Sequence, residues 1–266
     1  MPTLAWATDI HLDFVKPRGV TELAERLAAD GPDGVVLSGD LSSSIGLLEH
    51  LETLAAHLER PIYFVLGNHD FYGGSIAGVR GAMDELTRTS PWLRWLPACG
   101  VVELGGGWAM VGHDGWGDGR AGDPLGSNVQ LNDWRAILEL SGLTRAARLA
   151  VLQALGDQAA AYFTRIVPAA LERASKLLVV THVPPFADAC WHEGKRSNDA
   201  WLPWFTGVAA GDALRAALAA RPDCTALVVC GHTHGAGEVA ILPNLRVVTG
   251  AADYGHPAPQ APLVLG

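Results

Sequence analysis

Residues 34–70 read GVVLSGDLSSSIGLLEHLETLAAHLERPIYFVLGNHD, and this stretch decides the fold. The apolar run 35–37 predicts a buried strand, and leucine and alanine at helical spacing over 47–58 predict an amphipathic helix. The apolar run 62–66 predicts the next strand. With an earlier strand at 4–8 and its helix, the order becomes βαβαβ, which is typical of a layered α/β fold.

The rest of the chain continues this alternation less regularly. Apolar runs at 101–104 and 108–111 predict two strands around a glycine-rich turn. The Ala- and Leu-rich stretch 132–175 predicts helices that are interrupted near Gly142 and Gly156. Beyond it we expect a helix over 212–220 and strands over 177–181, 226–230, 239–242, 246–249 and 263–265.

Composition favours a globular enzyme over a membrane protein or a nucleic-acid-binding protein. The chain has 266 residues, 49% of them apolar, which is enough for a sizeable core in one domain spanning residues 1–266. Its 19 Lys and Arg against 28 Asp and Glu give a net charge of -9, which disfavours binding to a nucleic acid. No segment approaches the roughly 20 apolar residues of a membrane span. The four cysteines lie far apart, so we expect reduced thiols and a cytoplasmic protein.

Side chains that can bind metal follow the predicted strands, at the point where each strand ends. In an open α/β sheet, ligands bind beyond the carboxyl ends of the strands. One such group alone is more often turn chemistry, but five groups at five strand ends together outweigh that interpretation. The groups are Asp9-Ile10-His11, Gly39-Asp40, Gly67-Asn68-His69-Asp70, Thr181-His182 and Gly231-His232-Thr233-His234.

The number of ligand-type residues in these groups predicts two metal ions. One ion needs three or four protein ligands, whereas seven residues of ligand type converge here. Two ions roughly 3.5–4 Å apart suit phosphoryl hydrolysis, because they neutralise the phosphate and lower the pKa of a bound water. Asp40 has two carboxylate oxygens and is the expected bridge. Such a mixed cage accepts several metals, and we expect Mn or Fe, with Zn, Co or Ni as alternatives.

The five groups resemble the calcineurin-like metallophosphoesterase superfamily, whose pattern D-x-H, G-D, G-N-H-[DE], H and G-H-x-H is matched in order between Asp9 and His234. The resemblance implies a four-layer α/β/β/α sandwich of two mixed sheets flanked by helices. It also implies two metal positions that share Asp40. The first would use Asp9, His11, Asp40 and His234, and the second Asp40, Asn68, His182 and His232.

The resemblance assigns His69 the role of general acid, which protonates the leaving oxygen because an alkoxide leaves poorly without a proton. Asp70 is expected to orient His69 and keep it protonated. We hypothesise that a metal-bridging hydroxide attacks phosphorus while Asn68 and the ions hold the equatorial oxygens. No covalent intermediate is required.

The substrate remains open at this point. A small-molecule or nucleotide phosphodiesterase or phosphomonoesterase is favoured, with a Ser/Thr protein phosphatase, a nuclease and a non-catalytic scaffold as alternatives. The segment 183–207 is expected either to form a lid or substrate wall or simply to fasten a long loop to the body. In the first case Lys195 and Arg196 would bind a phosphate or carboxylate, and the tryptophans of this segment would stack on a ring.

Four further polar residues are expected to have ordinary roles. His50 and His57 lie off the apolar face of their helix and are predicted to be solvated. His113 is expected to form a loop hydrogen bond, and Asp13 to fix the ring of His11.

Overall fold

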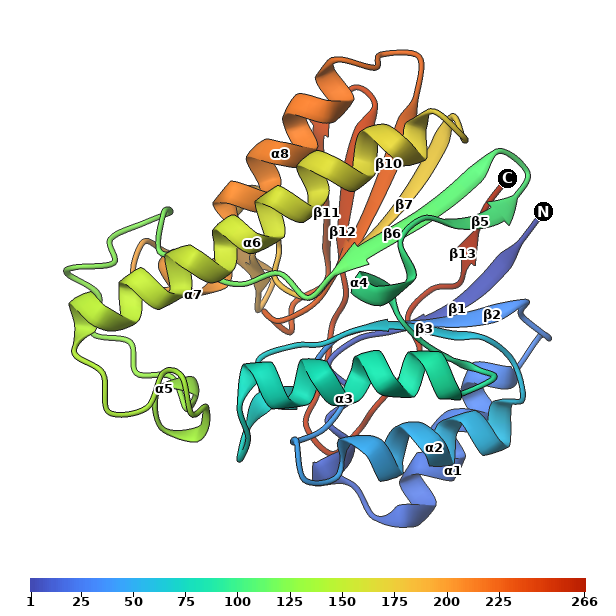
Figure 1. Ribbon diagram of the computed structural model, residues 1–266, viewed down its shortest axis with the longest axis horizontal. Coiled ribbons are helices and arrows are strands. Elements are labelled where there is room, and N and C mark those ends of the chain that lie inside the picture. Colours follow the sequence, from blue (N-terminus) through green and yellow to red (C-terminus); the bar gives the residue numbers. More distant parts are fainter.

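Two β-sheets lie face to face in the computed structural model, which describes residues 1–266 (Figure 1). The first sheet has the strand order β13-β1-β2-β3-β4. Its pairings are parallel except for the antiparallel pairing of β13 with β1, so the sheet is mixed. Its strands are β1 (Thr3–Ala7), β2 (Gly34–Ser38), β3 (Ile62–Val65), β4 (Leu93–Trp95) and β13 (Leu263–Val264).

The second sheet has the order β11-β12-β10-β7-β6-β5. Its four inner strands run parallel, and both edge strands pair antiparallel to their neighbours. Its strands are β5 (Val102–Gly105), β6 (Trp108–His113), β7 (Lys176–Thr181), β10 (Thr225–Cys230), β11 (Gly237–Leu242) and β12 (Leu245–Thr249). A separate two-stranded hairpin pairs β8 (Trp191–His192) with β9 (Lys195–Arg196).

Helices cover the outer face of each sheet, which confirms the expected four-layer α/β/β/α sandwich (Figure 1). The first sheet is covered by α1 (Pro17–Ala28), α2 (Leu47–Leu58) and α3 (Ile76–Thr89). The second is covered by α6 (Arg145–Leu171) and α8 (Val208–Ala219). The short helical segments are α4 (Leu96–Cys99), α5 (Asp133–Ala136), α7 (Leu202–Phe205), η1 (Leu12–Phe14), η2 (His69–Phe71) and η3 (Ala187–Ala189).

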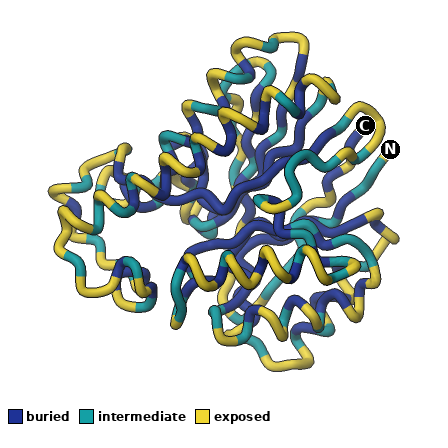
Figure 2. The backbone as a smooth tube through the Cα atoms, viewed as in Figure 1, coloured by how far each residue is buried: buried dark blue, intermediate teal, exposed yellow.

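The inner strands are apolar without interruption because both of their faces are buried (Figure 2). In β7, Leu177 and Val179 pack in the cluster under α6 and α8. The alternate residues Leu178 and Val180 pack in the cluster between the two sheets. This alternation follows from the two-residue period of a strand, so one face of β7 packs against the helices and the other face packs against the first sheet.

The structure differs from the sequence prediction in three helices. The helix α3 was not predicted, although Ile76, Val79 and Met83 follow helical spacing and are buried. The helix α6 is unbroken over 27 residues, so the predicted interruption at Gly156 is wrong. A Cβ at Gly156 would lie 2.5 Å from Cβ of Asp118, so glycine is required there for close packing. The helix α8 begins at Val208 instead of residue 212.

No helix has both the length and the apolar character needed to cross a bilayer. All four cysteines are free thiols, as expected.

Candidate metal centre and active site

The five predicted groups come together where strands of both sheets end. Asp9 follows β1, Asp40 follows β2, and Asn68 lies just beyond β3 in the first sheet. His182 follows β7, and His232 lies just beyond β10 in the second sheet. Because these strands run parallel within each sheet, their carboxyl ends share one edge, and the loops meet there.

The donor atoms form two groups that share Asp40. One group contains Asp9, His11, Asp40 and His234, and the other contains Asp40, His182 and His232. Within each group the donor atoms all lie within 4.8 Å of one another. The Nε2 atom of His182 lies 3.3 Å from Oδ1 of Asp40, and Nε2 of His234 lies 3.3 Å from Oδ1 of Asp9. Two adjacent positions for cations are therefore present, with Asp40 between them.

Hydrogen bonds fix which nitrogen of two histidines faces the cage. His182 donates from Nδ1 to the carbonyl of Ser38 at 2.9 Å, so its Nε2 is the nitrogen that faces Asp40. His232 donates from Nε2 to the carbonyl of Trp204 at 3.2 Å, so its Nδ1 faces Nε2 of His182 at 3.2 Å. Such bonds on the outer nitrogen are typical of imidazoles that bind metals.

Several residues of the cage have left-handed backbone conformations, which persist only where the surrounding structure holds them. Left-handed φ values occur at Asp9 (50°), His11 (39°), Asp40 (52°), His232 (71°) and His234 (57°). Each such residue costs of order 1–3 kcal/mol unless its surroundings compensate, and clusters of them mark functional sites. Most of the predicted ligands are therefore held in a strained turn directly after a strand.

Two glycines allow the loops to approach this closely. A Cβ at Gly67 would lie 2.1 Å from Oδ1 of Asp40, and one at Gly231 would lie 2.0 Å from Oδ2 of Asp9. No side chain fits at either position, so the glycines of the motifs are explained by steric contact with the carboxylates.

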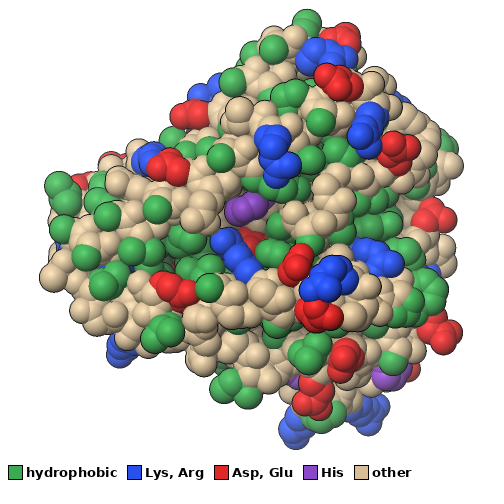
Figure 3. Space-filling model, viewed as in Figure 1, with side chains coloured by type: hydrophobic (Ala, Val, Ile, Leu, Met, Phe, Trp, Pro, Cys, Tyr) green, Lys and Arg blue, Asp and Glu red, His purple; other side chains and the backbone are tan.

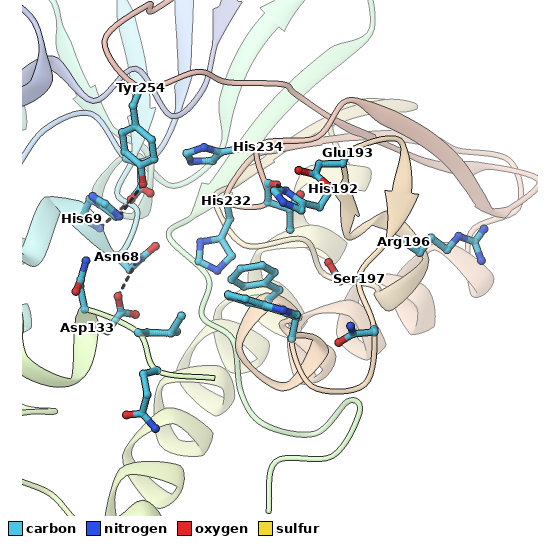
Figure 4. Close-up of a pocket in the computed structure, with 18 of the residues that line it drawn as sticks. Asn68, His69, Asp133, His192, Glu193, Arg196, Ser197, His232, His234 and Tyr254 are labelled. Carbon is cyan, nitrogen blue, oxygen red and sulfur yellow. Dashed lines mark hydrogen bonds between the residues drawn. The ribbon is translucent and has the colours of Figure 1, made fainter. Parts of the chain in front are cut away.

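Asn68 supplies the observation that tests whether the cage fits a metal. Its amide nitrogen donates to Oδ1 of Asp133 at 2.8 Å (Figure 4). The same nitrogen donates to the hydroxyl of Tyr72 at 3.2 Å. Its Oδ1 atom is buried and has no hydrogen-bond partner. A buried carbonyl oxygen without a donor is costly unless a cation is bound, so Asn68 fits a ligand role. Both amide protons have partners within the protein, which leaves no donor for the substrate-binding role expected of Asn68.

His69 lies beside the cage, but its contacts differ from the expected one with Asp70. Its backbone N–H donates to Oδ1 of Asp40 at 2.8 Å, and its ring stacks on Tyr72 with centroids 4.2 Å apart. Its Nε2 lies 3.4 Å from the hydroxyl of Tyr254 (Figure 4).

The predicted contact between Asp70 and His69 is wrong. The carboxylate of Asp70 is fully buried and accepts three backbone N–H bonds, from Leu41 and Ser42 at 2.8 Å and from Gly67 at 2.7 Å. Asp70 therefore joins the loop that carries Asp40 to the loop that carries Asn68, and its carboxylate forms no hydrogen bond with His69.

Burial and neighbouring charges act in different directions on the histidines and carboxylates of the cage. Burial lowers the pKa of His232 to about 3 and that of His11 to about 4, so both rings are neutral ligands. For His182, burial acts to lower the pKa, but the carboxylate of Asp40 outweighs it and raises the pKa to about 10. Burial also acts against ionisation of Asp40, yet His182 holds the pKa of Asp40 well below its usual value.

A cavity of about 640 Å³ opens above the cage and contains Asp40, Asn68, His69, His232 and His234 among its lining residues. One wall comes from the segment predicted as a lid, and the opposite wall from residues 130–133 and Tyr72. The lid-side residues are His192, Glu193, Lys195, Arg196, Ser197, Asn198, Trp201 and Phe205.

The two predicted cationic residues of this wall differ in their surroundings. Arg196 pairs with Asp188 and lies over the ring of Trp191, with 5.5 Å from Cζ to the ring centroid. In Figure 4 its side chain is directed away from the histidines, so it does not offer its charge to the cage. Lys195 is exposed, lines the cavity and forms no salt bridge.

Three of the lining residues that were missed from the sequence contact Asn68 or His69: Asp133, Tyr72 and Tyr254. Tyr72 follows the G-N-H-D group by two residues, which was a usable signal. Asp133 and Tyr254 come from long irregular connections, where no periodicity indicates which side chain faces the site.

Two of the four ordinary roles are confirmed. His57 is exposed, and His113 accepts a hydrogen bond from the N–H of Gly115 at 3.1 Å. His50 is half-buried and bonds Ser42 at 2.8 Å, so its predicted solvation is wrong. Asp13 is exposed and does not fix His11, whose Nδ1 has no partner.

Comparisons with known proteins agree with this geometry. The family model for calcineurin-like phosphoesterases matches residues 2–236. A phosphopantetheinyl hydrolase from Mycobacterium tuberculosis has the same fold, with a TM-score of 0.65 at 18% identity over 98% of this chain and 96% of that one. A dimetal phosphatase from Danio rerio matches with a TM-score of 0.55 at 15% identity over 94% and 87%. No curated protein matches the chain in sequence.

The family model covers most of the chain, including all five ligand groups from Asp9 to His234. Members of this family are built around a dinuclear metal centre, and the donor groups that share Asp40 are its counterpart here. The chain belongs to the calcineurin-like phosphoesterase family and is a metal-dependent phosphoric ester hydrolase.

Proposed function

We propose that the protein hydrolyses phosphate monoesters or diesters of small molecules, with two metal ions bound on either side of Asp40. Asp9, His11, Asp40 and His234 would hold one ion, and Asp40, Asn68, His182 and His232 the other. Bound there, two cations supply a nucleophile from water and neutralise charge on the phosphate. The observation that carries the proposal is the pair of donor groups sharing Asp40 at the base of the cavity.

His69 is the proposed proton donor to the leaving oxygen. It lines the cavity beside the cage, and its backbone bond to Asp40 and its stacking on Tyr72 fix the ring. The hydroxyl of Tyr254 approaches Nε2 and can hold the proton-carrying nitrogen toward the cavity. A donor in this place contributes typically about 10²- to 10⁴-fold to the rate.

The cavity walls favour a small ester over a phosphorylated protein side chain. Residues of 183–207 cover one side, and the aromatic rings of Trp201 and Phe205 with the ammonium of Lys195 line it. We propose that this segment is a substrate wall that binds the leaving group through ring contacts and charge. The net charge of -9 disfavours a nuclease, and on the face drawn in Figure 3 basic side chains are interspersed with acidic ones.

The test uses metal-free protein loaded with Mn²⁺ and assayed on p-nitrophenyl phosphate, bis-p-nitrophenyl phosphate, a cyclic nucleotide and a phosphopantetheinyl ester. We expect turnover that requires Mn²⁺ and that is lost in Asp40→Asn. An Mn²⁺-loaded protein that hydrolyses none of these esters would contradict the proposal. A protein active only on phosphorylated polypeptides would replace it with a protein phosphatase.

A further inference from the structure

Asp133 is a buried carboxylate beside the cage that belongs to none of the five motif groups. It is the first residue of α5, in the long connection between β6 and α6, and it is only 4% exposed. Its Oδ1 accepts a hydrogen bond from the amide of Asn68 at 2.8 Å (Figure 4). It also accepts one from the hydroxyl of Tyr72 at 2.5 Å. The presence of a carboxylate at this buried position requires a structural explanation, because burial disfavours its charge.

The position of Asp133 is fixed independently of its side-chain bonds. The N–H of Gly73 donates to the carbonyl of Ala136 at 2.8 Å, and the N–H of Leu138 donates to the carbonyl of Gly74 at 3.1 Å. The carboxylate of Glu139 accepts from the N–H groups of Ile76 at 2.9 Å and Ala77 at 3.1 Å. The segment that carries Asp133 is thus attached to the backbone that directly follows Asn68 and His69.

The chemistry of a carboxylate decides how the amide of Asn68 is oriented. An ionised carboxylate only accepts hydrogen bonds, so the NH₂ end of Asn68 must face Asp133. The carbonyl oxygen must then face the opposite way, where it is buried and without a donor. With the amide rotated by half a turn, two oxygens would meet at Asp133 and the NH₂ group would face the cation position.

Tyr72 supports the same arrangement from a second side. Its hydroxyl donates to Asp133 and accepts from the amide of Asn68, so the three side chains form a closed triangle. Its ring also stacks on His69. One small group of side chains therefore holds both the amide at the cage and the imidazole next to it.

We propose that Asp133 is a positioning residue that fixes the amide of Asn68 with its oxygen toward the second metal position, and so sets the affinity of that position alone. The inference rests on the proposed function, because it presumes that Asn68 binds a metal. Residues that orient metal ligands typically contribute about 10- to 100-fold to metal affinity when they are removed.

The experiment titrates metal-free protein with Mn²⁺ by calorimetry and follows spin coupling between bound ions by electron paramagnetic resonance. The variants are Asp133→Ala, which removes the acceptor, and Asp133→Asn, whose amide oxygen can still accept from Asn68 and Tyr72. Arg135→Ala is the matched control, since Arg135 is an exposed residue of the same short helix. Thermal unfolding of each metal-free variant shows whether it is folded.

We expect wild type and Arg135→Ala to bind a coupled Mn²⁺ pair. In Asp133→Ala one Mn²⁺ should bind about 10- to 100-fold more weakly and the coupled signal should give way to that of an isolated ion. Asp133→Asn should recover most of the loss. Equal binding of both ions in Asp133→Ala, equal weakening of both, or no recovery in Asp133→Asn would overturn the inference. Failure of wild type to bind two ions would instead refute the proposed function.

Discussion

Replacement of Asp70 by asparagine separates a structural role for this carboxylate from a catalytic one. Oδ1 of Asp70 accepts from Leu41 and Ser42, and Oδ2 accepts from Gly67. In Asp70→Asn the amide oxygen can keep the first two bonds, but the amide nitrogen faces the N–H of Gly67, which loses its acceptor. One buried, unsatisfied N–H costs about 1–3 kcal/mol.

This cost translates into a measurable shift in thermal unfolding. For a chain of this size a loss of 1 kcal/mol lowers Tm by about 2–4 °C, so we expect Asp70→Asn to unfold about 2–12 °C below wild type. Asp70→Ala leaves three buried N–H donors without an acceptor, which costs about 3–9 kcal/mol of stability. That approaches the whole stability of a typical domain, about 5–15 kcal/mol, so we expect little folded Asp70→Ala.

The assay follows circular dichroism of metal-free protein during heating, because bound metal would add its own stabilisation. Asp84→Asn, an exposed carboxylate on α3, is the matched control and should unfold within experimental error of wild type. If Asp70→Asn unfolded at the wild-type temperature while the basic limb of its pH–rate profile moved, where loss of the proton from His69 would lower activity, Asp70 would act on His69, and a structural role would be refuted.

Three other substitutions test separate parts of the site. His69→Ala should lower kcat on an alkyl phosphoester by about 10²- to 10⁴-fold with bound Mn²⁺ unchanged, and unchanged kcat would exclude the acid role. Gly67→Ala should abolish Mn²⁺ binding because its Cβ would lie 2.1 Å from Oδ1 of Asp40. Gly81→Ala is the control, since no atom lies within 4 Å of a Cβ at that position. It should keep Mn²⁺ binding and gain about 0.5–1 kcal/mol of stability. Lys195→Ala should raise KM by up to about fivefold, the equivalent of about 1 kcal/mol, whereas Arg196→Ala should leave KM unchanged. An equal rise of KM in both variants would argue against a wall that binds substrate through Lys195.

The layered fold and the convergence of the five groups were predictable from the sequence. The inner strands are apolar on both faces, and each ligand group lies at or just beyond the carboxyl end of such a strand, so topology alone brings Asp40 and His182 together. The glycines before these groups are also explained, since Gly67 and Gly231 face carboxylates at distances that exclude a side chain.

The contacts that orient the ligands were not predictable in this way. Asp70 follows His69 in the chain, yet two amide donors from the loop of Asp40 and one from Gly67 decide where its carboxylate points. Asp133 reaches Asn68 only because backbone hydrogen bonds attach its irregular segment to residues 73 and 74. Arg196 was expected to bind a phosphate or carboxylate, but its guanidinium pairs with Asp188. Each outcome depends on a neighbour that is distant in sequence or that has no periodic pattern.

An anomalous diffraction map of crystals soaked in Mn²⁺ tests the dinuclear centre most directly. We expect two peaks, one on each side of the Asp40 carboxylate, roughly 3.5–4 Å apart, as two-metal hydrolases require. One should lie among Asp9, His11 and His234, and the other among Asn68, His182 and His232. A single peak, or no peak in contact with Asp40, would contradict a two-metal mechanism for this protein.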